Sequence, residues 1–146
     1  MIDALIHSRP DLIHLCDLVD SCEDGKSALG MSTGEKWTFF APNDDAFDEL
    51  GDTLVGVSDA TALKLLLFHA VNGEEIFSGD LPCISGDNLI KMANGLDSRT
   101  LCDKDGPVGQ KGGGNINGPA DFVQADIETC NGVVHIIDKV LLYPGL

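Results

Sequence analysis

Two continuous apolar runs stand out in the hydrophobic pattern of this chain. The first covers residues 37–41 and is closed by Pro42, and the second follows an Asn-Gly pair and covers residues 133–142 with few polar interruptions. Runs of this kind are typical of strands that are buried on both faces. A buried strand so near the C-terminus needs a central partner, so we expect the two runs to pair and to hold the core together.

Helical spacing dominates the chain before residue 71. Apolar positions three and four residues apart predict one helix that starts near Ser8 and Pro10 and another that starts after Ser58. Asn43 is a good N-cap for a further helix over residues 44–50. The apolar positions behind the first two predictions are Leu12, Leu15, Cys16, Val19, Leu63, Leu66, Leu67 and Ala70.

Strand and turn signals dominate after residue 71. Four Asn-Gly pairs mark tight turns, and short segments with strand character lie between them. Helices first and strands later predict an α+β domain with antiparallel sheets, and the lack of βαβ alternation argues against a doubly wound nucleotide-binding sheet. The expected strands are Glu75–Phe77, Leu81–Ser85, Asn88–Met92, Arg99–Asp103 and Phe122–Glu128, and a short helical piece is expected at Ser27–Met31.

Length and charge narrow the classes of protein that this chain can belong to. With 146 residues it is expected to form one domain with its own core. Its 24 acidic and 9 basic residues give a formal charge of −15, which argues against nucleic-acid partners and against docking on an anionic membrane. The longest apolar run is too short to span a bilayer, so we do not expect a membrane-spanning chain. The acidic surface is interpreted mainly as solubilising.

The five cysteines lack the spacing of a zinc site, because they include no Cys-x-x-Cys pair. Cys83 and Cys102 flank a strand-rich segment, and we predict a disulfide between them. Cys16 and Cys130 are the second candidate pair, which leaves Cys22 over. The alternative is that all five are small buried hydrophobic side chains.

Three segments resemble the fasciclin domain family in the family's own order. Thr38–Phe47 is similar to the first family signature, and Asn131–Leu142, followed by Tyr143 and Pro144, is similar to the second. Between them, Leu65–Gly73 resembles the family helix that leads into a Tyr-His pair and a glycine turn. The likeness covers residues 10–144, and three ordered motifs in one domain-sized chain are a specific signal.

The resemblance implies a single domain over residues 1–146, built as a wedge-shaped antiparallel β-sandwich of about seven strands flanked by several α-helices. It also implies a non-catalytic adhesion or binding module that recognises protein, matrix or glycan partners, including a cell-surface receptor or a second copy. Secretion or display at the cell surface is expected, with any signal or anchor segment outside this chain.

Two pairs of residues match positions that the resemblance links to receptor binding in some family members. Some animal members are linked to integrin binding through an Asp-Ile pair, which corresponds here to Asp126 and Ile127, and through the Tyr-His region. Phe68 and His69 stand in that second region, and Phe68 replaces the tyrosine. His69 is expected at a helix end, where the dipole favours a protonated ring. His135 is expected to form hydrogen bonds inside the core.

No arrangement typical of an enzyme is found in the sequence. It contains neither a Gly-x-Ser-x-Gly elbow nor a recognisable Cys-His frame, so we predict no catalytic residues. His7 and His14 could share a helix face and bind zinc only with help from Asp11 or Asp17. The glycines after Lys111 lack the other parts of a phosphate-binding loop. We therefore predict no resident metal or cofactor.

Two alternatives to a plain adhesion module remain open at this point. One is a small-ligand carrier or sensor that uses an apolar cleft between sheets and helices. The other is a calcium-dependent matrix component, because Asn43, Asp44, Asp45, Asp48 and Glu49 gather oxygen ligands that could bind Ca²⁺ weakly. That cluster lacks the glycine and the bidentate Glu of an EF-hand, and an acidic first helical turn is the simpler interpretation.

Overall fold

Seven strands form a sheet in which β1 and β7 are adjacent central strands, with the order β2-β1-β7-β6-β5-β4-β3. The computed structural model describes residues 2–21, 36–83, 88–115, 118–130 and 132–144. The strands are β1 (Trp37–Pro42), β2 (Ala70–Asn72), β3 (Leu89–Lys91), β4 (Asp97–Asp103), β5 (Gly106–Gly112), β6 (Ala120–Thr129) and β7 (Gly132–Ile137). The described helices are α1 (Ile2–Ser8), α2 (Ile13–Ser21), α4 (Asp44–Leu50), α5 (Asp59–Leu67) and the 3-10 helix η1 (Ser78–Asp80).

The predicted pairing of the first and last apolar runs is confirmed. β1 and β7 lie side by side over their full lengths, from Trp37 opposite Gly132 to Pro42 opposite Ile137, and every residue of both strands is buried. The pair is parallel, whereas the other strand pairs within the described residues are antiparallel. Parallel neighbours need a long crossover, and here almost the whole domain separates the two strands in sequence.

Two apolar clusters cover the opposite faces of this central pair. One contains Phe39 and Val134 and packs against the N-terminal helices and α5. The other contains Phe40 and Ile137 and packs against Phe68 and the strands that follow. Alternate residues of a strand point to opposite faces, so neighbouring phenylalanines enter different clusters. Burial on both faces explains why neither strand shows polar alternation.

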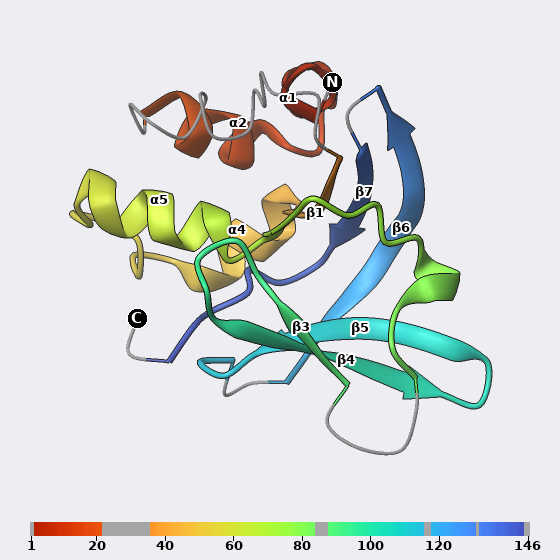
Figure 1. Cartoon of the computed structure of the whole chain (residues 1–146). Helices are drawn as coiled ribbons and strands as arrows, with labels where there is room; N and C mark the ends of the chain where they lie inside the picture. The colour runs from red at the N-terminus through yellow and green to blue at the C-terminus, as the bar shows by residue number, and fades with distance from the viewer. Residues whose placement is uncertain (1, 22–35, 84–87, 116–117, 131, 145–146) are drawn as a thin grey trace.

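The long strand β6 joins two parts of the sheet and gives it a wedge shape. Its first residues, Ala120 and Asp121, pair with β5, and the stretch from Phe122 to Thr129 pairs with β7. Figure 1 shows the helices gathered around β1 and β7, while β3, β4 and β5 form a separate layer at the other end of β6. In the described part of the chain, no strand pairs with the outer side of β6 beyond Asp121.

The helix predictions are confirmed where capping chemistry is strong. Asn43 accepts a hydrogen bond from the backbone N–H of Ala46 at the start of α4, and Ser58 does the same for Thr61 at the start of α5. The predicted start of the N-terminal helix, near Ser8 and Pro10, is wrong. Ser8 ends a helix, α1, that was not expected, and the next helix begins at Ile13.

β2 and β5 are not predicted by the sequence pattern, and two predicted strands do not form in the described residues. β5 escaped notice because glycine and proline have poor strand propensity, yet Gly112 is needed there. A Cβ at that position would overlap the carbonyl oxygen of Leu142 and the ring of Phe68. The short strand β2 was also missed. Glu75–Phe77 is extended but joins no ladder, and Leu81–Cys83 forms no strand. Ser27–Met31, Cys22 and residues 84–85 lie outside the described residues.

The predicted Cys83–Cys102 disulfide is confirmed, with the two Cα atoms 5.9 Å apart. It ties the start of a loop to β4. The second candidate pair is wrong, because Cys16 and Cys130 are not bonded to each other. Cys16 lies on α2 beside the first apolar cluster, whereas Cys130 follows the end of β6 and is exposed.

We expect the double substitution Cys83→Ser with Cys102→Ser to lower the free energy of unfolding by about 3 kcal/mol, because the bridge closes a loop between residues 19 apart in sequence. Urea denaturation under non-reducing conditions measures this change. Cys130→Ser is the matched control and should shift stability by less than ~0.5 kcal/mol, since its side chain is exposed. Equal stability of both variants would show that the bridge contributes nothing.

Candidate functional site

Asp126 occupies an irregularity in β6 that turns its side chain outward. The register between β6 and β7 shifts between Gln124 and Ile127, so extra residues bulge out of the ladder. Asp126 has a φ of 61°, a left-handed conformation that aspartate tolerates better than most residues. Bulges re-aim side chains and disrupt pairing. Here the result is a carboxylate whose side chain is 41% exposed.

His135 lies behind this bulge and satisfies its backbone. Its Nδ1 is 3.1 Å from the backbone nitrogen of Asp126, and its Nε2 is 2.7 Å from the carbonyl oxygen of Ile76. An amide N–H only donates and a carbonyl only accepts, so Nδ1 accepts and Nε2–H donates. The ring is therefore neutral. Burial lowers its pKa, outweighing the opposing effects of the Ile76 carbonyl and of Asp126. The predicted core hydrogen bonding of His135 is confirmed.

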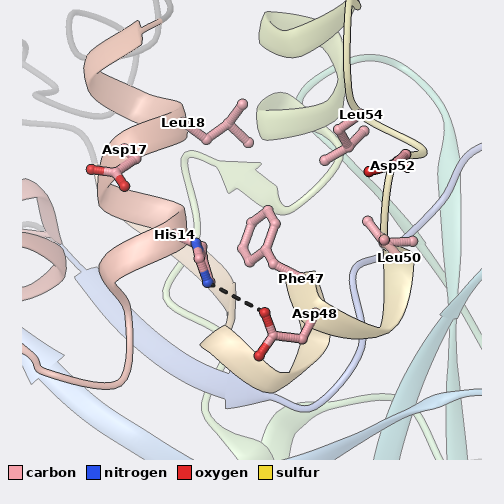
Figure 2. Close-up of a pocket in the computed structure, with 9 residues that line it drawn as sticks. His14, Asp17, Leu18, Phe47, Asp48, Leu50, Asp52 and Leu54 are labelled. Carbon is pink, nitrogen blue, oxygen red and sulfur yellow. Dashed lines mark ion pairs between the residues drawn. The ribbon is translucent and has the colours of Figure 1, made fainter.

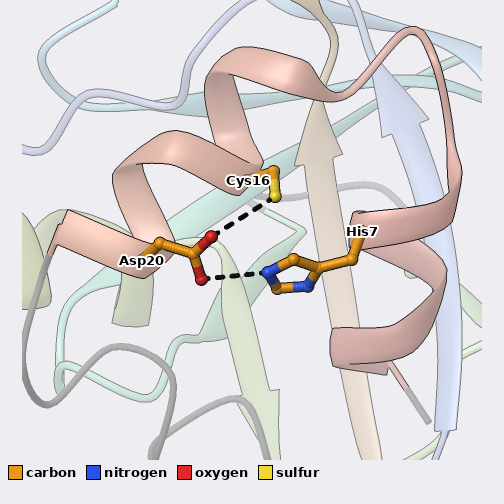
Figure 3. A group of neighbouring side chains, drawn as sticks. All are labelled: His7, Cys16 and Asp20. Atoms are coloured by element: carbon orange, nitrogen blue, oxygen red, sulfur yellow. Dashed lines mark hydrogen bonds and ion pairs between the residues drawn. The ribbon is translucent and has the colours of Figure 1, made fainter.

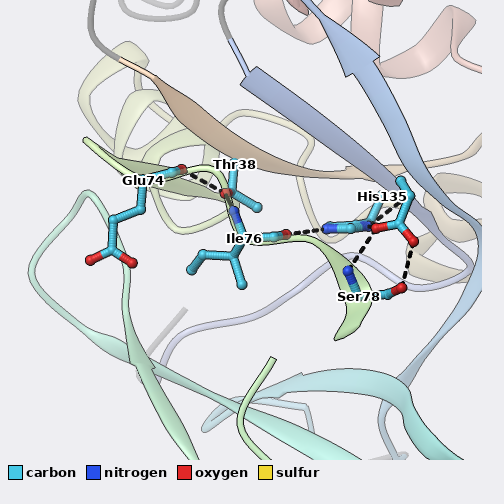
Figure 4. Close-up of polar contacts among 6 residues, drawn as sticks. Thr38, Glu74, Ile76, Ser78 and His135 are labelled. Carbon is cyan, nitrogen blue, oxygen red and sulfur yellow. Dashed lines mark hydrogen bonds and ion pairs between the residues drawn. The ribbon is translucent and has the colours of Figure 1, made fainter. Parts of the chain in front are cut away.

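The segment from Glu74 to Ser78 is bound to three strands by side-chain hydrogen bonds (Figure 4). Thr38 of β1 donates its hydroxyl to the carbonyl of Glu74 and accepts the N–H of Ile76, each at 2.8 Å. The Asp126 carboxylate accepts the backbone N–H of Ser78 at 2.6 Å and also its hydroxyl hydrogen. These contacts explain why the segment is extended without joining a ladder.

The same contacts keep Asp126 ionised. Partial burial alone would raise the pKa of its carboxyl, but the two hydrogen bonds from Ser78 outweigh burial and lower it overall. Ser78 was not expected at this site, because it is 48 residues away in sequence and no local pattern links the two.

The surroundings of Asp126 combine charge with exposed apolar surface. Val123, three residues earlier on β6, is 58% exposed, and Gln124 and Glu128 are exposed as well. Ile127 is only partly exposed and packs against the first apolar cluster. The two residues of the predicted pair therefore differ in role: Asp126 is accessible, whereas Ile127 is anchored in the core. We call Ser78, Val123, Gln124 and Asp126 the Asp126 face.

The other predicted pair, Phe68 and His69, is buried and cannot touch a partner in this structure. His69 Nδ1–H donates to the carbonyl of Leu65, and Nε2 accepts the N–H of Leu141. Burial lowers the pKa of His69 to about 4, so the expected protonated ring is wrong. Desolvation outweighs the attraction of the helix end. Phe68 packs edge-on against Tyr143 in the second cluster.

A groove with a volume of about 490 Å³ lies between α2, α4 and the residues that follow α4 (Figure 2). Its apolar lining comes from Leu18, Phe47, Leu50 and Leu54, and its polar lining comes from His14, Asp17, Asp48 and Asp52. His14 and Asp48 form an ion pair across it at 3.4 Å. An apolar cleft was expected between sheets and helices, whereas this groove lies between helices.

Three of the four carboxylates proposed for calcium, Asp44, Asp48 and Glu49, have partners within the protein. Asn43 caps α4, and Asp44 accepts the backbone N–H of His14 at 2.8 Å. Glu49 binds Lys139 through both of its oxygens. These contacts favour the interpretation of an acidic first helical turn.

The residues considered for zinc binding, and the glycines after Lys111, have structural roles instead. His14 pairs with Asp48, and Asp11 pairs with Arg9, so the proposed zinc set is not assembled in that form. A Cβ at Gly114 would overlap the carbonyl of Tyr143, so the glycine run allows close packing on the C-terminal segment.

The arrangement first defines a class, which is an α+β domain with a wedge of two sheets that share β6 and with helices around the central parallel pair. Sequence comparison then matches residues 12–144 to the fasciclin domain family, so the chain belongs to that family. Among the described residues, no helix is long and apolar enough to cross a membrane.

Three known proteins illustrate the relationship. The chain is 30% identical over 123 residues to protein sll1483 of Synechocystis, covering 78% of this chain and 59% of that protein. It is 30% identical over 112 residues to human periostin, covering 75% of this chain and 12% of periostin. A solved FAS1 domain pair from the insect cell adhesion molecule fasciclin I superposes with a TM-score of 0.67 at 21% identity, over 90% of this chain and 45% of that one. The chain thus spans only part of each.

We expect His135→Ala to lower the free energy of unfolding by roughly 2–4 kcal/mol, because the Asp126 N–H and the Ile76 carbonyl would both lose their partner. Urea denaturation at pH 7 measures the change. His14→Ala removes a surface imidazole and is the control, with an expected change below ~0.5 kcal/mol. A small effect at both positions would contradict the supporting role of His135.

We expect the stability of the chain to fall as the pH drops from about 6.5 toward 4, partly through His69. The unfolded chain binds a proton on this residue near its ordinary pKa of 6.5, whereas the folded chain resists protonation until about pH 4. The resulting loss at pH 4.5 is roughly 2–3 kcal/mol relative to pH 7. The contribution of His69 is isolated by measuring the unfolding free energies of the wild type and of His69→Gln at both pH values. If the wild type and His69→Gln lost the same unfolding free energy between pH 7 and pH 4.5, the contribution of His69 would be refuted.

Proposed function

We propose that this chain is a non-catalytic adhesion or binding module of a secreted or cell-surface protein, and that it recognises a protein partner through the Asp126 face. The main support for this proposal is the accessible, ionised carboxylate of Asp126, which is held in place by a bulge and by Ser78. Family membership supports the coarser part of the proposal, because the FAS1 domains of fasciclin I come from a cell adhesion molecule.

The geometry suits binding because the Asp126 side chain is already ordered before a partner binds. The left-handed backbone of Asp126, its two contacts with Ser78 and the buried His135 hold the carboxylate in one position before a partner arrives. Groups that are already ordered lose less conformational entropy on association. Val123, three residues earlier on the same strand, is exposed and adds apolar contact area.

The partner chemistry that fits best is a protein surface that carries Arg, Lys or a bound cation. A chain with a formal charge of −15 attracts basic surfaces over several ångströms and accelerates encounter with them. A second copy has the same charge, so homophilic pairing through this face would work against like-charge repulsion. Matrix components and glycans remain within the proposal when they present cationic groups.

A second candidate function is supported by the groove between α2 and α4. Its apolar floor and its aspartates, Asp17, Asp48 and Asp52, would suit a small ligand with an apolar body and a cationic end. This alternative uses a surface formed by other elements than the Asp126 face. Substitutions can therefore separate the two.

We expect Asp126→Asn to reduce attachment of cultured cells from the source organism to plates coated with this chain by about 10-fold or more, as loss of a central interface residue does. Asparagine tolerates the left-handed backbone and keeps most of the shape, so the change tests charge. Val123→Ser is expected to act in the same direction. Counting attached cells over a range of coating densities measures both.

Glu128→Gln is the matched control, because it removes an exposed acid from the same strand outside the bulge. Attachment that survives Asp126→Asn but is lost with Leu54→Glu would move the function to the groove. Loss of attachment or of self-association on adding EDTA, with all variants equal, would favour the calcium-dependent alternative. Attachment unaffected by every change would refute the proposed face.

A further inference from the structure

Three side chains of different chemistry meet where α1 contacts α2 (Figure 3). His7 Nε2 lies 2.9 Å from one carboxylate oxygen of Asp20, and Cys16 Sγ lies 3.7 Å from the other. The nitrogen, the sulfur and a carboxylate oxygen all lie within 4.8 Å of one another. The cluster is separate from the Asp126 face, which is built from β6 and η1.

The positions of the three groups follow from the packing of the helices. Cys16 and Asp20 are four residues apart on α2, so they share one face of that helix. His7 lies in the last turn of α1. Both helices are anchored in the first apolar cluster through Ile6 and Leu15, which sets their relative position. The cluster thus bridges two elements that the core already holds together.

The geometry points to a zinc site formed by His7, Cys16 and Asp20, and we propose that Zn²⁺ binds there. Imidazole nitrogen, thiolate sulfur and carboxylate oxygen are the three usual zinc ligands. Ligand atoms at 2.0–2.3 Å from a tetrahedral metal lie roughly 3–4 Å from each other, which side-chain rotation can reach from the observed separations. The described residues supply three protein ligands, and a tetrahedral zinc takes one more ligand, which in many zinc sites is water.

Zinc would take the place of the hydrogens that now join these groups. Binding removes the proton from the Cys16 thiol and releases it to solvent, and it needs an unprotonated Nε2 on His7. The Asp20 carboxylate and the new thiolate together balance the charge of the metal. The affinity should therefore rise with pH, and the bound metal should hold α1 against α2. The sequence pattern had suggested His7 with His14, but the fold brings Cys16 and Asp20 to His7 instead.

The experiment uses the full chain with Cys22→Ser and Cys130→Ser, so that Cys16 is the sole cysteine outside the disulfide. Isothermal titration with Zn²⁺ measures stoichiometry and affinity, and Co²⁺ reports sulfur ligation through a thiolate-to-cobalt absorption band in the near ultraviolet. We expect one metal per chain, a cobalt band and a higher melting temperature with zinc.

His7→Gln, Cys16→Ser and Asp20→Asn should each weaken zinc binding by more than the ~10–100-fold that follows loss of an outer-shell partner. Cys16→Ser should also abolish the cobalt band. His14→Gln is the matched control, since it removes a nearby histidine that lies outside the cluster, and it should change nothing. His7→Gln in the otherwise unaltered chain repeats the test if the serine background folds poorly. Weak binding at several sites, equal in all variants and without a cobalt band, would overturn the proposal.

Discussion

The parallel pairing of β1 with β7 is the constraint on which the rest of the structure depends. The two strands are far apart in sequence, lie in register over six residues each and are buried on both faces. Backbones in such a pair must approach closely, and at Gly132 a Cβ would overlap the backbone of Trp37. Everything between the two strands has to leave the first and return to the second. That requirement places the N-terminal helices against one face, while α4 and the later strands contribute to the cluster on the other.

Two buried histidines turn this arrangement into a rigid one. His69 links the end of α5 to Leu141, and His135 links the bulge of β6 to the segment before Ser78. Each ring donates through one nitrogen and accepts through the other, so each is neutral and fully used. The family motifs that contain these residues are therefore mainly architectural. In the proposed function they act indirectly, because His135 supports the backbone that presents Asp126.

The features with functional chemistry lie outside this core, on segments that the core positions. The Asp126 face lies on β6 beyond the point where any described strand pairs with its outer side, the groove lies between α2 and α4, and the His7 cluster joins α1 to α2. All three carry carboxylates, in keeping with the strongly acidic chain. The three proposals therefore share one kind of partner, a cationic group on a protein, on a small ligand or as a metal ion.

Local patterns in the sequence determined the family, the two buried strands, the caps of α4 and α5 and the Cys83–Cys102 bridge. Those features depend on residues close together in the chain or on continuous apolar runs, whose physical meaning does not change with context. Tertiary structure alone decided the parallel direction of β1 and β7, the use of glycine in β5, the burial of Phe68 and His69, and the contact of Ser78 with Asp126. Each of these depends on which distant segments become neighbours, and desolvation or close backbone contact there overrides the local preference. Asp126 became a candidate through the family resemblance, but its exposure, its charge state and its support by His135 depend on the fold.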